Sequence, residues 1–132
     1  MTSRKLLLRW ASGIMVVMGG GHLSLLLFLK WEAVAGWAER GLWATVPLLS
    51  PGDLANKATF WGSLGSFSIP LILLGCLTWH LAGRGVAVPA GVGWGVAAWC
   101  LVSGVLLVPS PFFAGIISGL LIVRAARLPC PA

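Results

Sequence analysis

The chain has 132 residues, of which 58% are hydrophobic and only 9% are charged. Soluble domains carry roughly 25% charged residues, so this composition excludes a soluble globular protein and predicts a single membrane domain over residues 1–132. The formal net charge is +6. Because the basic residues stand at the ends of apolar runs or in the loops between them, where charges flank membrane spans, we exclude nucleic acid as a partner.

The first predicted element is a membrane span over residues 10–29, since a span needs about 20 apolar residues. Basic residues precede it, as they would precede the apolar core of a secretory signal. The run is longer than such a core, and the only small-residue site nearby, at residues 33–35, lies beyond Lys30. We therefore expect the segment to be retained as a span.

Residues 31–46 predict a helix that lies on the membrane surface. At 100° per residue, apolar side chains share one face of this helix and the charged side chains lie away from it. The apolar face consists of Trp31, Val34, Ala35, Ala38 and Leu42. This pattern is typical of an interfacial helix. An ordinary helical connection is the favoured interpretation, and a lid over a lipid-facing site is the alternative.

Three further spans are predicted at residues 58–82, 87–108 and 110–127. Asp53 or Asn56 could cap the first of these. Pro109 and Pro111 separate the last two, because proline lacks an amide hydrogen and biases the preceding residue away from a helix. The predicted fold is therefore an all-α membrane protein with four transmembrane helices in a compact bundle.

Two glycine pairs in the last spans predict close helix packing. Gly91 and Gly95 in the third span, and Gly115 and Gly119 in the fourth, have the GxxxG spacing that lets helix backbones approach in a membrane. We favour packing within the chain over a dedicated homodimer face.

The distribution of positive charge predicts the orientation. The N-terminal segment, the loop at residues 83–85 and the C-terminal tail carry six of the nine basic residues, whereas the three acidic residues all lie in the loop of residues 30–57. Cytoplasmic loops carry an excess of Lys and Arg. We therefore expect a multi-pass protein of the cytoplasmic membrane with both termini in the cytoplasm.

His22 is the candidate for chemistry. It follows Trp10 by twelve residues, which puts it about 18 Å from the inner boundary and near the bilayer midplane. An ionisable residue at such a depth is a functional hypothesis by default. The candidates for a polar cluster or a pocket lining around it are Ser66, Ser68, Cys100, Ser103, Ser118, Trp61 and Trp99.

Pro70 suggests a partner for His22. A proline within a helix leaves the carbonyl group four residues earlier, here that of Ser66, without its usual donor. The favoured interpretation is that His22 hydrogen-bonds this carbonyl or a serine, and so joins the first two spans without doing chemistry. The alternatives are a neutral histidine that binds a ligand or moves a proton, and a pH switch.

The sequence indicates no metal and no cofactor. The cysteines, Cys76, Cys100 and Cys130, form no CxxC or Cys/His metal pattern, and His80 lies about 15 Å from His22 in depth. No acidic residue falls inside a predicted span. The chain therefore lacks the intramembrane glutamate of small multidrug exporters and the paired acids of membrane prenyltransferases.

Short motifs along the chain carry a family resemblance. They are Arg9-Trp10-x-x-Gly13, Gly21-His22, Thr59-Phe60-Trp61-Gly62, Gly93-Trp94-Gly95 and Pro109-Ser110-Pro111-Phe112-Phe113. Together they resemble an uncharacterised family of small four-span bacterial membrane proteins over roughly residues 9–128. The resemblance implies an integral membrane protein and draws attention to His22 and Trp61, but it implies no activity. Pro111 stands where a small residue such as glycine is expected.

The leading hypothesis is a non-enzymatic accessory or interaction protein, with the lipid bilayer and either a second copy or another membrane protein as partners. The alternative is a small membrane enzyme or binder for an apolar lipid or isoprenoid, with His22 as the proton donor or acceptor. A transporter or channel formed by an oligomer is third. The sequence leans against an enzyme.

Overall fold

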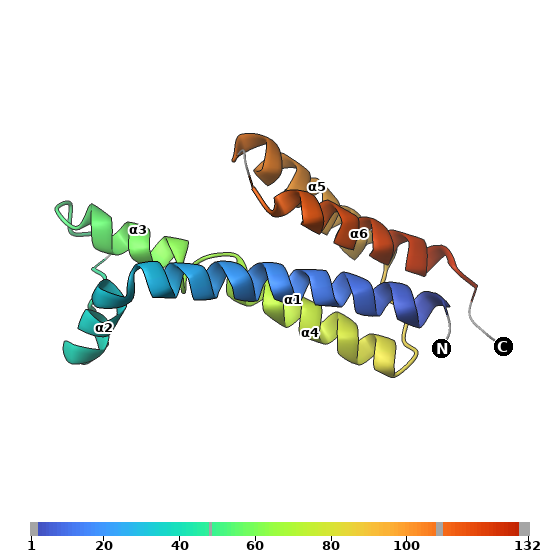
Figure 1. Ribbon diagram of the computed structural model, residues 1–132, viewed down its shortest axis with the longest axis horizontal. Helices are drawn as coiled ribbons and strands as arrows, with labels where there is room; N and C mark the ends of the chain where they lie inside the picture. Colours follow the sequence, from blue (N-terminus) through green and yellow to red (C-terminus); the bar gives the residue numbers. More distant parts are fainter. Residues whose placement is uncertain (1–2, 48, 108–109, 130–132) are drawn as a thin grey trace. The chain divides into compact units, whose positions relative to one another are not determined.

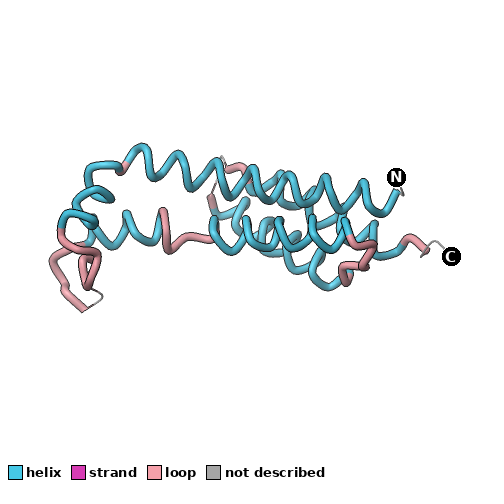
Figure 2. The backbone as a smooth tube through the Cα atoms, turned by 90° about the horizontal axis from the view of Figure 1, so that it is seen from below, coloured by secondary structure: helices cyan, strands magenta, loops and turns pink. Residues whose placement is uncertain are grey.

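The computed structural model describes residues 3–47, 49–107 and 110–129. Within these residues the chain is all helical, with six helices and no strand (Figure 2). The helices are α1 (Ser3–Leu29), α2 (Trp31–Glu39), α3 (Leu54–Gly62), α4 (Ser68–Gly83), α5 (Ala90–Leu106) and α6 (Phe112–Arg127). The predicted end of the third span at Val108, the turn residue Pro109, and Cys130 lie outside the described residues.

The chain divides into two compact units, residues 1–18 with 70–132, and residues 19–69. In the first unit, α5 and α6 lie side by side as an antiparallel pair (Figure 1). A Cβ atom built on Gly93 would lie 2.5 Å from the carbonyl oxygen of Gly119, and one on Gly119 would lie 2.7 Å from the backbone nitrogen of Ala97. The two backbones are therefore in direct contact.

The glycines of α5 that were predicted to pack are not the ones at this contact. Nothing lies within 4 Å of a Cβ atom built on Gly91 or Gly95, and both residues are exposed. The buried face of α5 instead carries Gly93, Ala97 and Cys100, whose spacing of four and three residues places them on one side of a helix. Gly91 and Gly95 are each two residues from Gly93, about 200° around the helix, and so face away. In α6, Gly115 and Gly119 both lie on the buried face.

Hydrogen bonds from side chains to backbone join the first half of α1 to its neighbours in the first unit. The buried Ser12 hydroxyl donates to the carbonyl of Gly75 in α4 at 2.5 Å, and the buried Ser118 hydroxyl of α6 donates to the carbonyl of Ala11 at 2.9 Å. At the start of α1, Arg4 Nε donates to the carbonyl of Ala125 at 3.2 Å. Each bond satisfies a buried or partly buried polar group, which is costly to leave unpaired in an apolar surrounding.

In the second unit, α2 ends at Glu39, seven residues before the predicted end of the interfacial segment at residue 46. Gly41, with φ of 83°, closes the helix. The Leu42 amide donates to the Trp37 carbonyl and the Gly41 amide donates to the Ala38 carbonyl, both at 3.0 Å. These two bonds form a Schellman motif, which ends a helix with a glycine in the left-handed region. Leu42, predicted on the apolar face, therefore lies outside the helix.

The predicted span at residues 58–82 is not one helix, because α3 ends at Gly62 and α4 begins at Ser68. Serine side chains occupy backbone acceptors at the interruption: the Ser63 hydroxyl donates to the Thr59 carbonyl and the Ser66 hydroxyl donates to the Ser63 carbonyl, both at 2.6 Å. Such local bonds compete with a continuous helix. Pro70 therefore lies in the first turn of α4, where proline is tolerated, and not inside a helix as predicted.

By length and composition, one described helix, α1, could cross a membrane. Only 22% of its most apolar 18-residue window is buried. The helices α4 and α5 are apolar but shorter, at 16 and 17 residues.

Candidate functional site

His22 lies in the second half of α1 and is half-buried. Its Nε2 atom is 3.0 Å from the carbonyl oxygen of Gly62, the last residue of α3. Because a carbonyl oxygen only accepts hydrogen bonds, this geometry requires the proton on Nε2. The bond joins two elements of the same unit that are forty residues apart in sequence.

The interruption after α3 makes the Gly62 carbonyl available to His22. In a continuous helix the Ser66 amide would donate to this carbonyl. Here the Ser66 amide donates to the Ser63 carbonyl instead, at 3.1 Å. The histidine therefore takes the place of a lost helical donor. The acceptor is Gly62, whereas the sequence pointed to the carbonyl of Ser66.

The His22 ring is also packed by apolar neighbours. Its centroid is 4.9 Å from that of Phe67, with the rings tilted by 41°. Leu26, one helical turn after His22, approaches Gly62, where a built Cβ atom would be 3.6 Å from its Cδ1 atom. The hydrogen bond and the contact with Phe67 together hold the His22 ring in one orientation, which is consistent with a structural role.

The serines around the interruption form hydrogen bonds with one another and with the nearby backbone. Ser63 and Ser68 are fully buried. The hydroxyls of Ser66 and Ser68 are 3.0 Å apart, and the Ser68 amide donates to the Ser66 hydroxyl oxygen at 3.2 Å. These contacts hold the interruption between α3 and α4. The role of Ser66 and Ser68 in a midplane cluster stays a prediction.

The remaining residues of the predicted cluster lie in the other unit. Cys100 is fully buried at the α5–α6 contact, Ser118 bonds the Ala11 carbonyl, and Ser103 is half-buried. The Trp99 ring stands edge-on to Phe112, with centroids 5.2 Å apart. Cys100, Ser118 and Trp99 thus take part in helix packing within that unit.

Trp61 belongs to the unit of His22 but to a different surface. Its ring packs edge-on against Phe60, with centroids 5.3 Å apart. Together with Trp37 and Leu64 it lines a largely apolar pocket of about 320 Å³. His22 does not line this pocket. The structure thus separates the two residues that the sequence singled out most strongly.

Asn56 is a polar residue whose role the sequence did not reveal. It accepts a hydrogen bond from Trp37 Nε1 at 2.5 Å, and its Nδ2 atom donates to the Thr45 carbonyl at 2.7 Å and to Asp53 Oδ2 at 2.8 Å. The sequence indicates only a helix cap at this position. Asp53 occupies the N-cap position of α3, but its side chain makes no cap hydrogen bond. The spacing of Asp53 and Asn56, three residues apart, was the available signal.

Within residues 3–47, 49–107 and 110–129, no three His, Cys, Asp or Glu side chains come together as metal ligands would. The arrangement around His22 offers one hydrogen-bonded imidazole, an aromatic ring and serines with local partners. Chemically, it can hold two chain segments together.

No curated protein and no solved structure matches this chain. A family model described as "Family of unknown function (DUF6463)" matches residues 7–129. Because this match covers far more than half of the sequence, the chain belongs to that family of unknown function.

Proposed function

We propose that the chain is an integral membrane protein with a non-enzymatic accessory or interaction role. The membrane part of the proposal is supported by the exposure of large apolar side chains on several helices, for example Val17 at 74%, Phe28 at 80%, Leu73 at 64% and Leu106 at 79%. Soluble monomers rarely expose apolar patches beyond a few hundred Å². A bilayer gives these side chains an apolar solvent.

The proposed orientation keeps both termini in the cytoplasm. It is supported by the excess of Lys and Arg in the N-terminal segment, the loop at residues 83–85 and the C-terminal tail. Trp31, 65% exposed, then lies near the outer interface, where indole rings are enriched. With 16 residues each, α4 and α6 are about 24 Å long, so they are accommodated by local thinning of the bilayer or by the residues that flank them.

The non-enzymatic part of the proposal depends on the bond between His22 and Gly62. Because the Nε2 proton of this histidine is donated to a backbone carbonyl, the side chain joins α1 to α3. Removing it leaves the carbonyl without its donor, which costs about 1 kcal/mol for hydrogen bonds between membrane helices.

The membrane proposal is tested by fractionating cells that produce the full chain and washing the membranes with alkaline carbonate. We expect the chain to stay in the pellet, and reporter fusions at either terminus to be active only as cytoplasmic reporters. Release into the carbonate supernatant would contradict membrane integration, and an exported reporter would contradict the orientation.

The role of His22 is tested by comparing His22→Ala and His22→Gln with His80→Ala, which changes the other histidine, an exposed residue near the end of α4. We expect His22→Ala to lower the free energy of unfolding in detergent by about 1 kcal/mol. His22→Gln keeps an N–H donor and should recover part of the loss, while His80→Ala should be neutral. A His22→Ala protein as stable as wild type would refute the structural role.

A second candidate function is binding of a small apolar molecule, which the pocket lined by Trp61, Phe60 and Trp37 favours. Ligand pockets in proteins are mostly apolar and aromatic, with few polar groups. Native mass spectrometry of the protein in mild detergent should then reveal a bound molecule of defined mass that Trp61→Ala loses. A ligand lost in His22→Ala but retained in Trp61→Ala would place the site elsewhere.

A further inference from the structure

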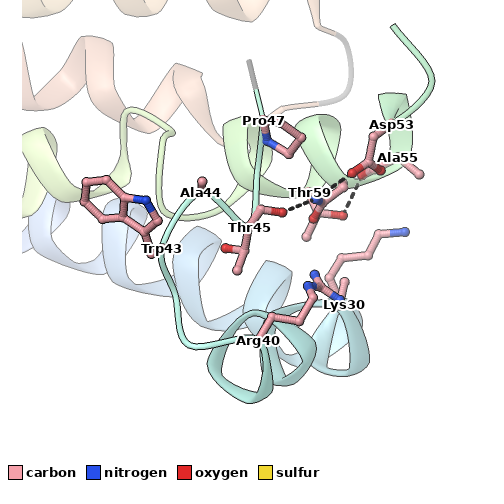
Figure 3. Close-up of a pocket in the computed structure, with 11 residues that line it drawn as sticks. Lys30, Arg40, Trp43, Ala44, Thr45, Pro47, Asp53, Ala55 and Thr59 are labelled. Carbon is pink, nitrogen blue, oxygen red and sulfur yellow. Dashed lines mark hydrogen bonds between the residues drawn. The ribbon is translucent and has the colours of Figure 1, made fainter. Parts of the chain in front are cut away.

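A second, more polar pocket lies in the unit of residues 19–69, between α2, the loop that follows it, and the start of α3 (Figure 3). It is open and has a volume of about 800 Å³. Neither His22 nor Trp61 lines it. This pocket is therefore distinct from the His22 contact and adjoins the pocket of Trp61, with which it shares Ala44 and Thr45.

Two cationic side chains line this pocket, Lys30 and Arg40. They flank α2 at its two ends, as the N-cap and C-cap residues, yet both side chains reach the same pocket (Figure 3). Among the described residues, neither side chain has a hydrogen-bond or ion-pair partner. Two like charges that share one pocket repel each other unless an anion lies between them.

The Arg40 guanidinium is seated by Gly36. A Cβ atom built on Gly36 would lie 3.3 Å from Arg40 Nη1, so the glycine leaves room for the guanidinium to lie back against α2.

Several of the other polar groups of the pocket are already engaged. Asn56 uses both hydrogens of its Nδ2 atom, on the Thr45 carbonyl and on Asp53 Oδ2, and the Thr59 hydroxyl donates to the Ala55 carbonyl. Asp53, the one acidic residue in the lining, is thereby held by Asn56. These hydrogen bonds hold the residues around the pocket in place. Lys30 and Arg40 are the cationic donors in the lining that remain available to a ligand.

The remaining basic residue of this unit has another partner. Lys57 Nζ donates to the Ser50 carbonyl and lines the apolar pocket of Trp61. Lys30 and Arg40 therefore supply the positive charge of the polar pocket, and Asp53 offsets part of it.

We propose that this pocket binds a phosphate group, with Arg40 as the planar, two-pronged donor and Lys30 as the point charge. Arginine matches the geometry of phosphate oxygens with two parallel N–H donors, and lysine complements it electrostatically. The phosphate is that of a phospholipid headgroup or of a soluble phosphate compound. Only the lipid form depends on the proposed membrane location.

Binding is tested on the full chain purified in an uncharged detergent and a phosphate-free buffer. One arm follows retention of phosphatidylglycerol by native mass spectrometry, with diacylglycerol of the same acyl chains as the lipid that lacks phosphate. The other arm titrates inorganic phosphate and follows heat release. Phosphatidylglycerol binding alone identifies a headgroup site, and inorganic phosphate binding identifies a soluble phosphate compound as a sufficient ligand.

Variants of the chain distinguish binding at this pocket from attraction of phosphate to the overall positive charge of the protein. We expect Arg40→Gln to weaken binding about tenfold and Lys30→Gln several-fold, while Arg127→Gln, which removes an exposed charge from α6, changes it less than about twofold. Gly36→Ala keeps both charges and asks the flexible end of Arg40 to move only slightly, so binding should stay within about twofold of wild type. Lys30→Gln is the second variant of the site if Arg40→Gln folds poorly.

The proposal is overturned if neither phosphatidylglycerol nor inorganic phosphate binds, if diacylglycerol is retained as well as phosphatidylglycerol, or if Arg127→Gln weakens binding as much as Arg40→Gln does. These readouts are taken in detergent, so they are independent of the carbonate test of membrane integration. A chain that fails the carbonate test and still binds inorganic phosphate would retain the phosphate site and lose the membrane role.

Discussion

The Ser118 hydroxyl donates a hydrogen bond of 2.9 Å to the carbonyl oxygen of Ala11 and so joins α6 to the first half of α1. Ser118 is completely buried. The Ala11 carbonyl belongs to the interior of α1, so Ser118 adds a second donor to an acceptor that has two lone pairs. The contact gives the buried α6 serine a hydrogen-bond partner.

Ser118→Ala should therefore lower the free energy of unfolding by about 1 kcal/mol, the usual net value of one hydrogen bond. Ser103→Ala is the matched control, because Ser103 is half-buried on α5. Denaturant titration of the purified protein, followed by circular dichroism, measures both changes. Equal effects of the two substitutions would show that the bond to Ala11 contributes nothing specific.

Glycine substitutions should distinguish the two faces of α5. Gly93→Ala places a methyl group 2.5 Å from the Gly119 carbonyl oxygen, and backbone atoms cannot yield as a flexible side chain can. We expect a loss of about 1–3 kcal/mol from overpacking. Gly91→Ala and Gly95→Ala meet open space and should raise stability by about 0.5–1 kcal/mol, since alanine is the better helix former.

The same melting experiments, combined with size-exclusion chromatography, provide the check. A destabilised Gly91→Ala or Gly95→Ala that also changes its elution volume would mean that the exposed face of α5 contacts a second copy. If Gly93→Ala is neutral, the close backbone contact with α6 is wrong.

The sequence predicted helical content well because its signals are local and repeated. Apolar runs at residues 10–29, 87–108 and 110–127 coincide with α1, α5 and α6 to within a few residues at most ends. Hydrophobicity determines where such a helix lies in the chain, but it does not determine which face touches a neighbour. In α5, Gly91, Gly93 and Gly95 are all small residues that could pack against a neighbouring helix. Only the contact with Gly119 in the structure shows that Gly93 is the one that does so.

The candidate site was harder to predict, because it depends on a backbone interruption. The run at residues 58–82 is apolar on average, and its serines have a hydropathy close to zero, so they do not indicate a break in the helix. The hydroxyls of Ser63 and Ser66 nevertheless bond nearby carbonyls and accompany the interruption of the helix. His22 stands out in the sequence because it is ionisable and lies deep in an apolar run, and the sequence predicts a backbone carbonyl as its partner. Which carbonyl it bonds depends on where α3 ends, and that residue is Gly62.

Asn56→Ala should loosen the loop between α2 and α3. The substitution removes the acceptor of Trp37 Nε1 and the donor to the Thr45 carbonyl and Asp53. We expect a stability loss of about 1–3 kcal/mol and faster trypsin cleavage after Arg40, which adjoins the loop. Limited proteolysis followed by mass spectrometry of the fragments measures the second effect.

Thr45→Ala is the control for that experiment, since it keeps the backbone carbonyl that Asn56 contacts and removes only the exposed hydroxyl that donates to the Leu42 carbonyl at 3.2 Å. Its cleavage rate should rise far less than that of Asn56→Ala. Asn56→Asp keeps an acceptor for Trp37 but brings a second carboxylate against Asp53 Oδ2 and the Thr45 carbonyl, so its loop should be cleaved at least as fast as that of Asn56→Ala. Cleavage of Asn56→Ala at the wild-type rate would show that the loop is held by other contacts.

Pro70→Ala tests whether proline causes the interruption between α3 and α4. Pro70 is the third residue of α4, a position at which the missing amide hydrogen has no helical acceptor to lose. We therefore expect unchanged helicity and a stability change within about 0.5 kcal/mol. If Pro70 instead interrupted a continuous helix, its removal would stabilise that helix by about 3 kcal/mol. Circular dichroism would then show added helical signal as residues 63–67 became helical. Such a gain would mean that the serine bonds follow from the proline, whereas an unchanged spectrum assigns the interruption to the serines and leaves the Gly62 carbonyl free for His22.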